Sequence, residues 1–184
     1  SVSIEANELS KKSPQLFKYL ANNKALIGRQ SKRSKTISRG NDFYSLSKVG
    51  AYTFSPNKVT FRDNTKLSAA VVQDVMTPWG EVVTPVCAKH CPYISKDKTG
   101  RDISEDEAYY LCGILNTPVV QQYFQATYSS RSFSINFNIK MPLYDSGDKY
   151  HQKIMELARE ATNNTVTDEL LNELEFNYLD MCKE

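Results

Sequence analysis

The residues best suited to chemistry form a run of cations near the start of the chain. Between Leu9 and Asn41 there are nine Lys or Arg residues and no Asp or Glu. The last five lie in a Ser-rich segment without regular periodicity: Arg29, Lys32, Arg33, Lys35 and Arg39. Because such side chains donate charge-assisted hydrogen bonds to phosphate oxygens, this segment suits a polyanion. A solvated surface loop would explain the same run equally well.

The segments on either side of these cations have the patterns of a helix and a strand. Ser13 followed by Pro14 predicts a helix start, because a Ser hydroxyl can cap free N–H groups where Pro has none. The apolar residues that follow predict a buried helix face: Leu16, Tyr19, Leu20, Ala25, Leu26 and Ile27. Phe43–Leu46 has strand propensity, and its Tyr44 could either pack in a core or contact a phosphate or base.

Two clusters could be taken for metal or catalytic sites. Cys87, His90, Cys91 and Cys112 could be imagined as zinc ligands, but the fourth lies in a predicted helix, so we expect free thiols and no metal. A group of acids beside Lys96 and Lys98 resembles a nuclease site: Asp97, Asp102, Glu105, Asp106 and Glu107. However, Ser104 and Glu107 fit a capping box, and acids are favoured at a helix start. The usual nucleotide-loop, GxSxG and HExxH motifs are absent, so we expect no catalytic residue.

The rest of the sequence predicts an α+β fold. Short runs broken by Gly and Pro predict strands at 50–54, 58–62, 69–72, 82–87 and 135–140. Pro78–Gly80 predicts a turn. No crossover helix fits between the earlier strands, so we expect a twisted sheet that is mostly antiparallel or mixed. Flanking helices are predicted at 105–115 and from Pro118, and a C-terminal helical pair at 150–161 and 167–181.

The composition and charge distribution suggest how the chain is organised. Its 184 residues, 40 % apolar, can bury one sizeable core. We divide it into a linker at 1–12, a main domain at 13–146, and a helical pair at 147–184 that packs on the domain or on a partner. The basic first quarter contrasts with the eight acidic residues of Met155–Glu184, which predicts one face for an anionic partner.

The cellular setting is inferred from what the sequence lacks. Four cysteines, no signal-like segment and no long apolar run predict a cytoplasmic protein without a membrane partner. Because the chain begins with Ser close to a helix start, we expect it to be a domain excised from a longer protein.

Several motifs follow one another in a characteristic order over roughly Ser13–Tyr178. They are a "YL…N…L…R" opening in Pro14–Arg29, then Tyr52–Val59, Tyr109–Val120, Ile139–Tyr144, His151–Ala158 and Leu170–Asp180. In this order they resemble the TaqI-like C-terminal specificity domain of adenine-N6 DNA methyltransferases and type IIG restriction–modification enzymes, with type I specificity subunits as more distant relatives. The sequence departs from that family at Thr117, where Ser is commoner.

This resemblance implies a target-recognition domain that binds double-stranded DNA and reads bases in the major groove. Catalysis would lie in a covalently linked methyltransferase domain, which would carry S-adenosylmethionine and an NPPY-type motif that flips the adenine. Neither the cofactor loop nor NPPY occurs here, so this fragment alone should neither methylate nor cut DNA. The parent enzyme could methylate only or also cleave.

The DNA-binding residues follow from side-chain chemistry within that framework. Arg29, Arg33 and Arg39 are candidates for bidentate guanine contacts, and Lys32 and Lys35 for phosphate contacts. Further residues could lie on the same face: Tyr44, Lys89, His90, Lys98 and Arg131. Two alternatives remain open. One is a protein-interaction module that uses the acidic C-terminal helices, with Leu170, Leu171, Leu174 and Tyr178 as its stripe, and the other is a small metal-dependent nuclease.

Overall fold

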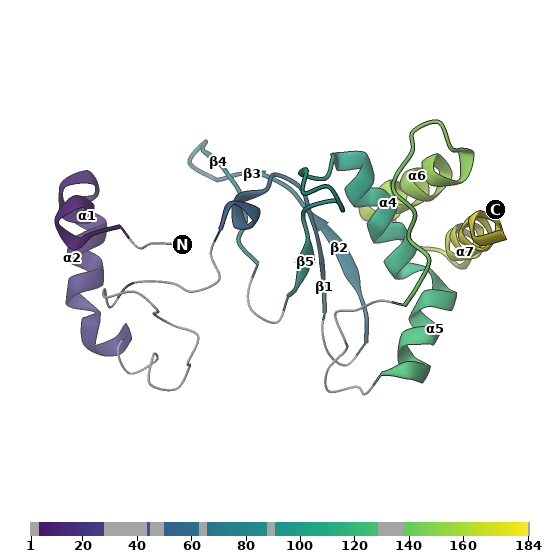
Figure 1. Ribbon diagram of the computed structural model, residues 1–184, viewed down its shortest axis with the longest axis horizontal. Helices are drawn as coiled ribbons and strands as arrows, with labels where there is room; N and C mark the ends of the chain where they lie inside the picture. Colours follow the sequence, from purple (N-terminus) through teal and green to yellow (C-terminus); the bar gives the residue numbers. More distant parts are fainter. Residues whose placement is uncertain are drawn as a thin grey trace. The chain divides into compact units, whose positions relative to one another are not determined.

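The chain has an α+β fold, shown in the computed structural model of Figure 1. The structure describes residues 4–27, 44, 50–62, 66–87, 91–128 and 138–183. These residues belong to two compact units, 1–53 and 54–184, which we describe separately. The predicted fold class is confirmed, whereas the predicted domain limits at 12/13 and 146/147 stay predictions.

The N-terminal unit contains two consecutive helices, α1 (Ala6–Lys12) and α2 (Pro14–Asn22). Most of the segment that we divide off as a linker at 1–12 is therefore helical. Ala, Glu, Leu and Lys in the α1 sequence are strong helix formers, and an ion pair of 2.6 Å joins Lys12 to Glu8 one turn earlier. Leu9 is the buried residue of this helix.

Helix α2 starts at Pro14 as predicted, but its environment differs from the prediction. Ser13 occupies the N-cap position without a side-chain capping hydrogen bond. No α2 residue is buried, and Leu16, Tyr19 and the following Leu26 are exposed. Leu16 and Tyr19 therefore lie on an exposed side of α2, whereas Leu26 follows the end of this helix at Asn22.

The second unit is built on a small antiparallel sheet of order β2-β1-β5, formed by β1 (Lys58–Phe61), β2 (Ala69–Val72) and β5 (Tyr93–Ile94). Val59 is opposite Val71 in β2 and Ile94 in β5. Val59 and Phe61, two residues apart, are both buried because alternate strand residues share a face. A separate hairpin is formed by β3 (Val75–Met76) and β4 (Val82–Val83), joined through the predicted turn at Pro78–Gly80.

Several predicted strands take other forms. Residues 51–54 form the 3₁₀ helix η1 (Ala51–Phe54), because Gly50 and Thr53 close a turn through two hydrogen bonds of 3.0 and 3.1 Å. β2 is only partly buried, and β4 ends at Val83 rather than continuing to Cys87. Residues 138–140 are not a strand, and the rest of the run predicted at 135–140 lies outside the described residues.

Helix α4 (Glu105–Asn116) is the centre of the core. It packs against β1 and β2 on one side and against α6 (Lys149–Asn163) on the other, as Figure 1 shows. The following helix α5 (Pro118–Thr127) and the final helix α7 (Asp168–Lys183) complete the helical layer. The predicted helical pair is thus confirmed. Three residues of its proposed docking stripe are buried core residues instead: Leu170, Leu174 and Tyr178.

The end of α4 is bonded directly to the edge of the sheet. The Asn116 side chain accepts a hydrogen bond from Ala69 N at 3.0 Å and donates one to Ala69 O at 2.9 Å. One turn earlier, the buried Cys112 thiol accepts a hydrogen bond of 3.4 Å from the same Asn116 amide. Asn116 therefore joins the end of α4 to Ala69 of β2.

Gly113 permits the close packing of α4 on α6. A Cβ atom there would lie 2.8 Å from Ile154 Cγ2 and 3.1 Å from the Ile154 carbonyl oxygen. Both distances are shorter than ordinary van der Waals contact, and Ile154 is fully buried. A larger residue at Gly113 must therefore push the helices apart.

We predict that Gly113→Val lowers the free energy of unfolding by about 1–3 kcal/mol, because it overpacks this contact. Glu156→Val, at an exposed position of α6, should cost less than about 1 kcal/mol because only helix propensity changes. Urea unfolding followed by circular dichroism measures both values. Equal losses in the two variants would contradict the role assigned to the α4–α6 contact.

Candidate nucleic-acid interface

Only two of the ten predicted DNA-binding residues lie in the part of the chain that the structure describes. Tyr44 belongs to the N-terminal unit and Lys98 to the second unit. The other eight lie outside the described residues: Arg29, Lys32, Arg33, Lys35, Arg39, Lys89, His90 and Arg131. The predicted strand at Phe43–Leu46 is likewise outside them except for Tyr44, which lies in a turn.

Tyr44 bonds to the start of the chain. Its hydroxyl donates a hydrogen bond of 2.8 Å to the carbonyl oxygen of Ile4, and the side chain is half-buried. A Tyr hydroxyl has one proton to donate, so contact with a phosphate through that proton would require this bond to break.

Lys98 is held at the tip of a tight turn organised by Asp97. One carboxylate oxygen of Asp97 accepts hydrogen bonds from Thr99 N at 2.8 Å, Thr99 Oγ1 at 2.6 Å and Arg101 N at 3.0 Å. Gly100 has a φ of +86°, a conformation that side chains with a Cβ rarely adopt. Asp97 and Gly100 together therefore present exposed Lys98 from a defined backbone.

Arg101 links this turn to the start of α4. Its guanidinium donates to Asp97 Oδ2 at 3.0 Å and to Glu107 Oε1 at 2.8 Å. The other Glu107 oxygen accepts from Ser104 N at 2.7 Å, and Ser104 Oγ accepts from Glu107 N at 3.1 Å. The predicted capping box is confirmed, and the Glu107 hydrogen bond raises the pKa of Arg101.

The remaining acids of the nuclease-like cluster also have cationic partners. Lys96 lies 2.7 Å from Asp102 and is the main cause of that carboxyl's lowered pKa. Arg159 of α6 lies 2.7 Å from Asp106 and 3.4 Å from Glu105. The cluster's acids are thus compensated within the fold, whereas Lys98 forms no ion pair with another described residue.

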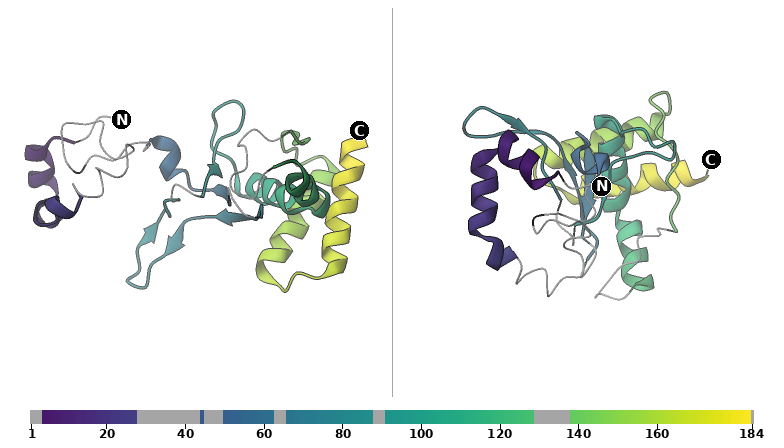
Figure 2. Two further views of the ribbon diagram at one scale, coloured as in Figure 1. Left: turned by 90° about the horizontal axis from the view of Figure 1, so that it is seen from below. Right: turned by 60° about the vertical axis from the view of Figure 1, so that its left-hand side comes forward.

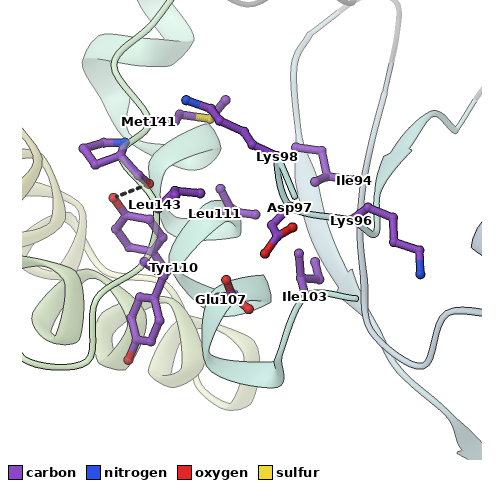
Figure 3. Close-up of a pocket in the computed structure, with 12 residues that line it drawn as sticks. Ile94, Lys96, Asp97, Lys98, Ile103, Glu107, Tyr110, Leu111, Met141 and Leu143 are labelled. Atoms are coloured by element: carbon purple, nitrogen blue, oxygen red, sulfur yellow. Dashed lines mark hydrogen bonds between the residues drawn. The ribbon is translucent and has the colours of Figure 1, made fainter. Parts of the chain in front are cut away.

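An apolar pocket of about 140 Å³ lies beside the turn. Its wall includes Ile94, Ile103, Leu111 and Met141, and Tyr110 donates a hydrogen bond of 3.3 Å to the carbonyl oxygen of Pro142 at one side. Figure 3 shows Lys98 extending toward Met141, whereas Asp97 and Glu107 line the pocket near Ile103. A cation beside a pocket large enough for a benzene-sized group could contact an anionic ligand that has an apolar part.

The cysteines do not gather into a metal centre in the described part of the chain. Cys112 is buried in α4, and burial raises its pKa to about 11. Cys87 and Cys91 are half-buried free thiols, and His90 between them lies outside the described residues. No group of three potential ligands meets among the residues that are described.

The β3–β4 hairpin was not predicted as a site from the sequence. It carries most of its apolar side chains into solvent, including Trp79 in the turn. The signal that could have found it is a strand pattern without polar alternation, since Val75, Met76, Val82 and Val83 are all apolar.

Comparisons with known proteins add no family. No protein-family model matches the sequence, and no curated protein matches it. No helix among the described residues is both long and apolar enough to cross a bilayer.

We predict that the Asp97 carboxylate stays ionised to unusually low pH. Its pKa is lowered from 3.8 to about 2, chiefly by the Thr99 hydroxyl and then by the backbone N–H groups of Thr99 and Arg101. Because the folded-state pKa is the lower one, its contribution to stability is present above about pH 4 and is lost as the pH falls through about 2. The amide NMR shifts of Thr99 and Arg101 should titrate accordingly.

Thr99→Val provides the matched control, because it removes the hydroxyl and nearly preserves the side-chain volume. The Asp97 midpoint should rise toward 3.8 in this variant. A midpoint near the ordinary value in the unmodified protein would contradict the turn geometry.

Proposed function

We propose that this chain is the target-recognition part of a restriction–modification adenine-N6 DNA methyltransferase and binds double-stranded DNA sequence-specifically. Methyl transfer would belong to a covalently linked domain that holds S-adenosylmethionine, and the whole enzyme would act in the cytoplasm. The whole enzyme would either methylate DNA only or also cleave it, depending on which other domains are linked to this chain. The support is the ordered set of motifs together with the charge pattern described above.

The observation that carries the proposal is the uninterrupted basic run between Leu9 and Asn41. Nine cations without one acid form a strongly positive stretch in a chain whose net charge is only +2. Most of the binding free energy of such a stretch would come from phosphate contacts, which are independent of sequence. Arg29, Arg33 and Arg39 are the residues we assign to base edges, since a guanidinium can bond guanine O6 and N7 together.

The second unit offers an additional cation from a different part of the sequence. Lys98 is exposed on the Asp97 turn, and the nearby acids are bonded to Arg101, Lys96 and Arg159. Compensation of these acids reduces repulsion of a phosphate close to Lys98. The same compensation weakens the nuclease alternative, which would need carboxylates free to bind a metal ion.

Duplex DNA of random sequence should bind in low salt, and log affinity should fall with log salt at a slope of about −0.9 per phosphate contacted. We predict that Arg33→Ala and Lys35→Ala each weaken binding, and that removal of a cation that neutralises one phosphate makes the slope shallower by about 1. Lys183→Ala is the control, because Lys183 pairs with Asp180 at 2.6 Å in acidic helix α7. Fluorescence anisotropy measures all three variants.

Absence of binding at low salt, or loop variants that match the unmodified chain, would overturn the proposal. Selection from randomised duplexes tests sequence specificity, and an enriched site is expected. Cleavage of the duplex in Mg²⁺ would favour the nuclease alternative instead.

Lys96, which is bridged to Asp102 beside the turn, is a matched control for Lys98. We predict that Lys98→Ala lowers DNA affinity several-fold and makes the salt slope shallower by about 1, as expected when one phosphate is no longer neutralised. Lys96→Ala should change the slope less, because Lys96 is already paired with Asp102 at 2.7 Å. Equal changes in DNA affinity and salt slope for the two substitutions would contradict the assignment of a specific phosphate contact to Lys98.

A further inference from the structure

The pocket beside the Asp97 turn is bordered by three segments of the second unit. Ile94 of β5 and Leu111 of α4 form part of its wall, and Met141 lies in the irregular segment that leads to α6. The pocket volume is about 140 Å³. Because an engineered apolar cavity of about 150 Å³ holds benzene, this pocket has room for a single six-membered ring.

Hydrogen bonds hold the pocket walls in place without a ligand. The Tyr110 hydroxyl of α4 donates to Pro142 O at 3.3 Å. On the other side of the same irregular segment, Asp145 N donates to His151 Nδ1 of α6 at 3.0 Å. Helix α4 packs in turn against α6, as both views of Figure 2 show. A pocket that is already formed favours binding, because little of the protein has to be ordered by the ligand.

The charges around the pocket favour an anion at its exposed side. Four charged residues line the pocket, and Lys98 is the one without an ion pair among the described residues. Asp97 and Glu107 share a single partner, Arg101, and their side chains are only 8 % and 9 % exposed. The inner side of the pocket therefore stays negative, whereas exposed Lys98 supplies a positive charge next to solvent.

An aromatic ring suits this pocket better than a flexible aliphatic chain. The Tyr110 ring and the Met141 thioether both line the pocket, as Figure 3 shows. Aromatic rings and thioether sulfur atoms both make favourable contacts with a further aromatic ring. A rigid ring also loses less conformational freedom on binding than a chain of equal size.

We propose that this pocket binds a small carboxylate that carries a single aromatic ring. The ring lies between Ile94 and Leu111, and the carboxylate points outward to the ammonium group of Lys98. This orientation keeps the charge of the ligand away from the carboxylates of Asp97 and Glu107, which would repel it. The site goes beyond the proposed DNA binding and does not depend on it.

Titration of the full chain with benzoate, without DNA, tests this proposal by methyl NMR. The methyl signals of Ile94, Leu111 and Met141 should shift with one common dissociation constant of about 1 mM or lower, which is reasonable for so small a ligand. The methyl signals of Leu174, a core residue of α7, should stay unchanged.

Lys98→Met tests the ion pair, because it removes the charge and keeps most of the side-chain stem. Benzoate affinity should fall about two- to fivefold, as expected for an exposed ion pair, whereas the affinity for neutral benzyl alcohol should stay the same. Lys183→Met is the matched control on α7 and should change neither affinity.

Leu111→Phe tests the pocket itself, because the larger side chain fills the space for the ring. Binding of both ligands should be lost, whereas Leu179→Phe, at an exposed position on α7, should leave both affinities unchanged. Ile94→Phe replaces Leu111→Phe if circular dichroism shows that the first variant is unfolded. Absence of methyl shifts up to about 20 mM benzoate, equal changes for benzoate and benzyl alcohol in Lys98→Met, or undiminished binding by the filled pocket would each overturn the proposal.

Discussion

Burial of α4 is the constraint on which the second unit depends. One side of this helix packs on β1 and β2, and Gly113 on another side allows α6 to approach within a distance that leaves no room for a Cβ atom. The helix start is fixed by the Ser104–Glu107 capping box, and its last turn by Thr117 Oγ1, which donates to the Gly113 carbonyl at 3.0 Å. Because both ends and both sides are determined, the sheet, α6 and the Asp97 turn acquire fixed positions around it.

This arrangement gives the charges of the second unit different roles. Arg101 and Arg159 stabilise acids at the start of α4, and buried Lys58 donates to the carbonyl oxygens of Ser55 and Pro85. These three cations therefore stabilise the fold, although in the sequence their charge is the same as that of Lys98. Position within a hydrogen-bond network, rather than charge alone, therefore separates structural cations from candidates for ligand contact.

The sequence predicted the features whose causes are local. The capping box at Ser104, the amphipathic C-terminal helices and β1 follow from residues close in the chain. The predicted burial of α2 was wrong, because helical spacing identifies an apolar side but not an element to cover it. The Asp97 turn was not predicted, although Asp followed by Thr and Gly is typical of a side-chain-stabilised turn. In the candidate site, the sequence singled out Lys98 and Tyr44. It could not predict the hydrogen-bond partner of Tyr44, because Ile4 is forty residues away and no local pattern points to it.

The bond between Asn116 and Ala69 has a consequence for how the sheet meets other chains. A strand at the edge of a sheet offers free N–H and C=O groups on which a further strand can grow, and aggregation often begins there. Here a side-chain amide supplies both the donor and the acceptor that a neighbouring strand would bring to Ala69. Helix α4 thus closes the β2 edge at Ala69, which protects this part of the edge against the addition of foreign strands.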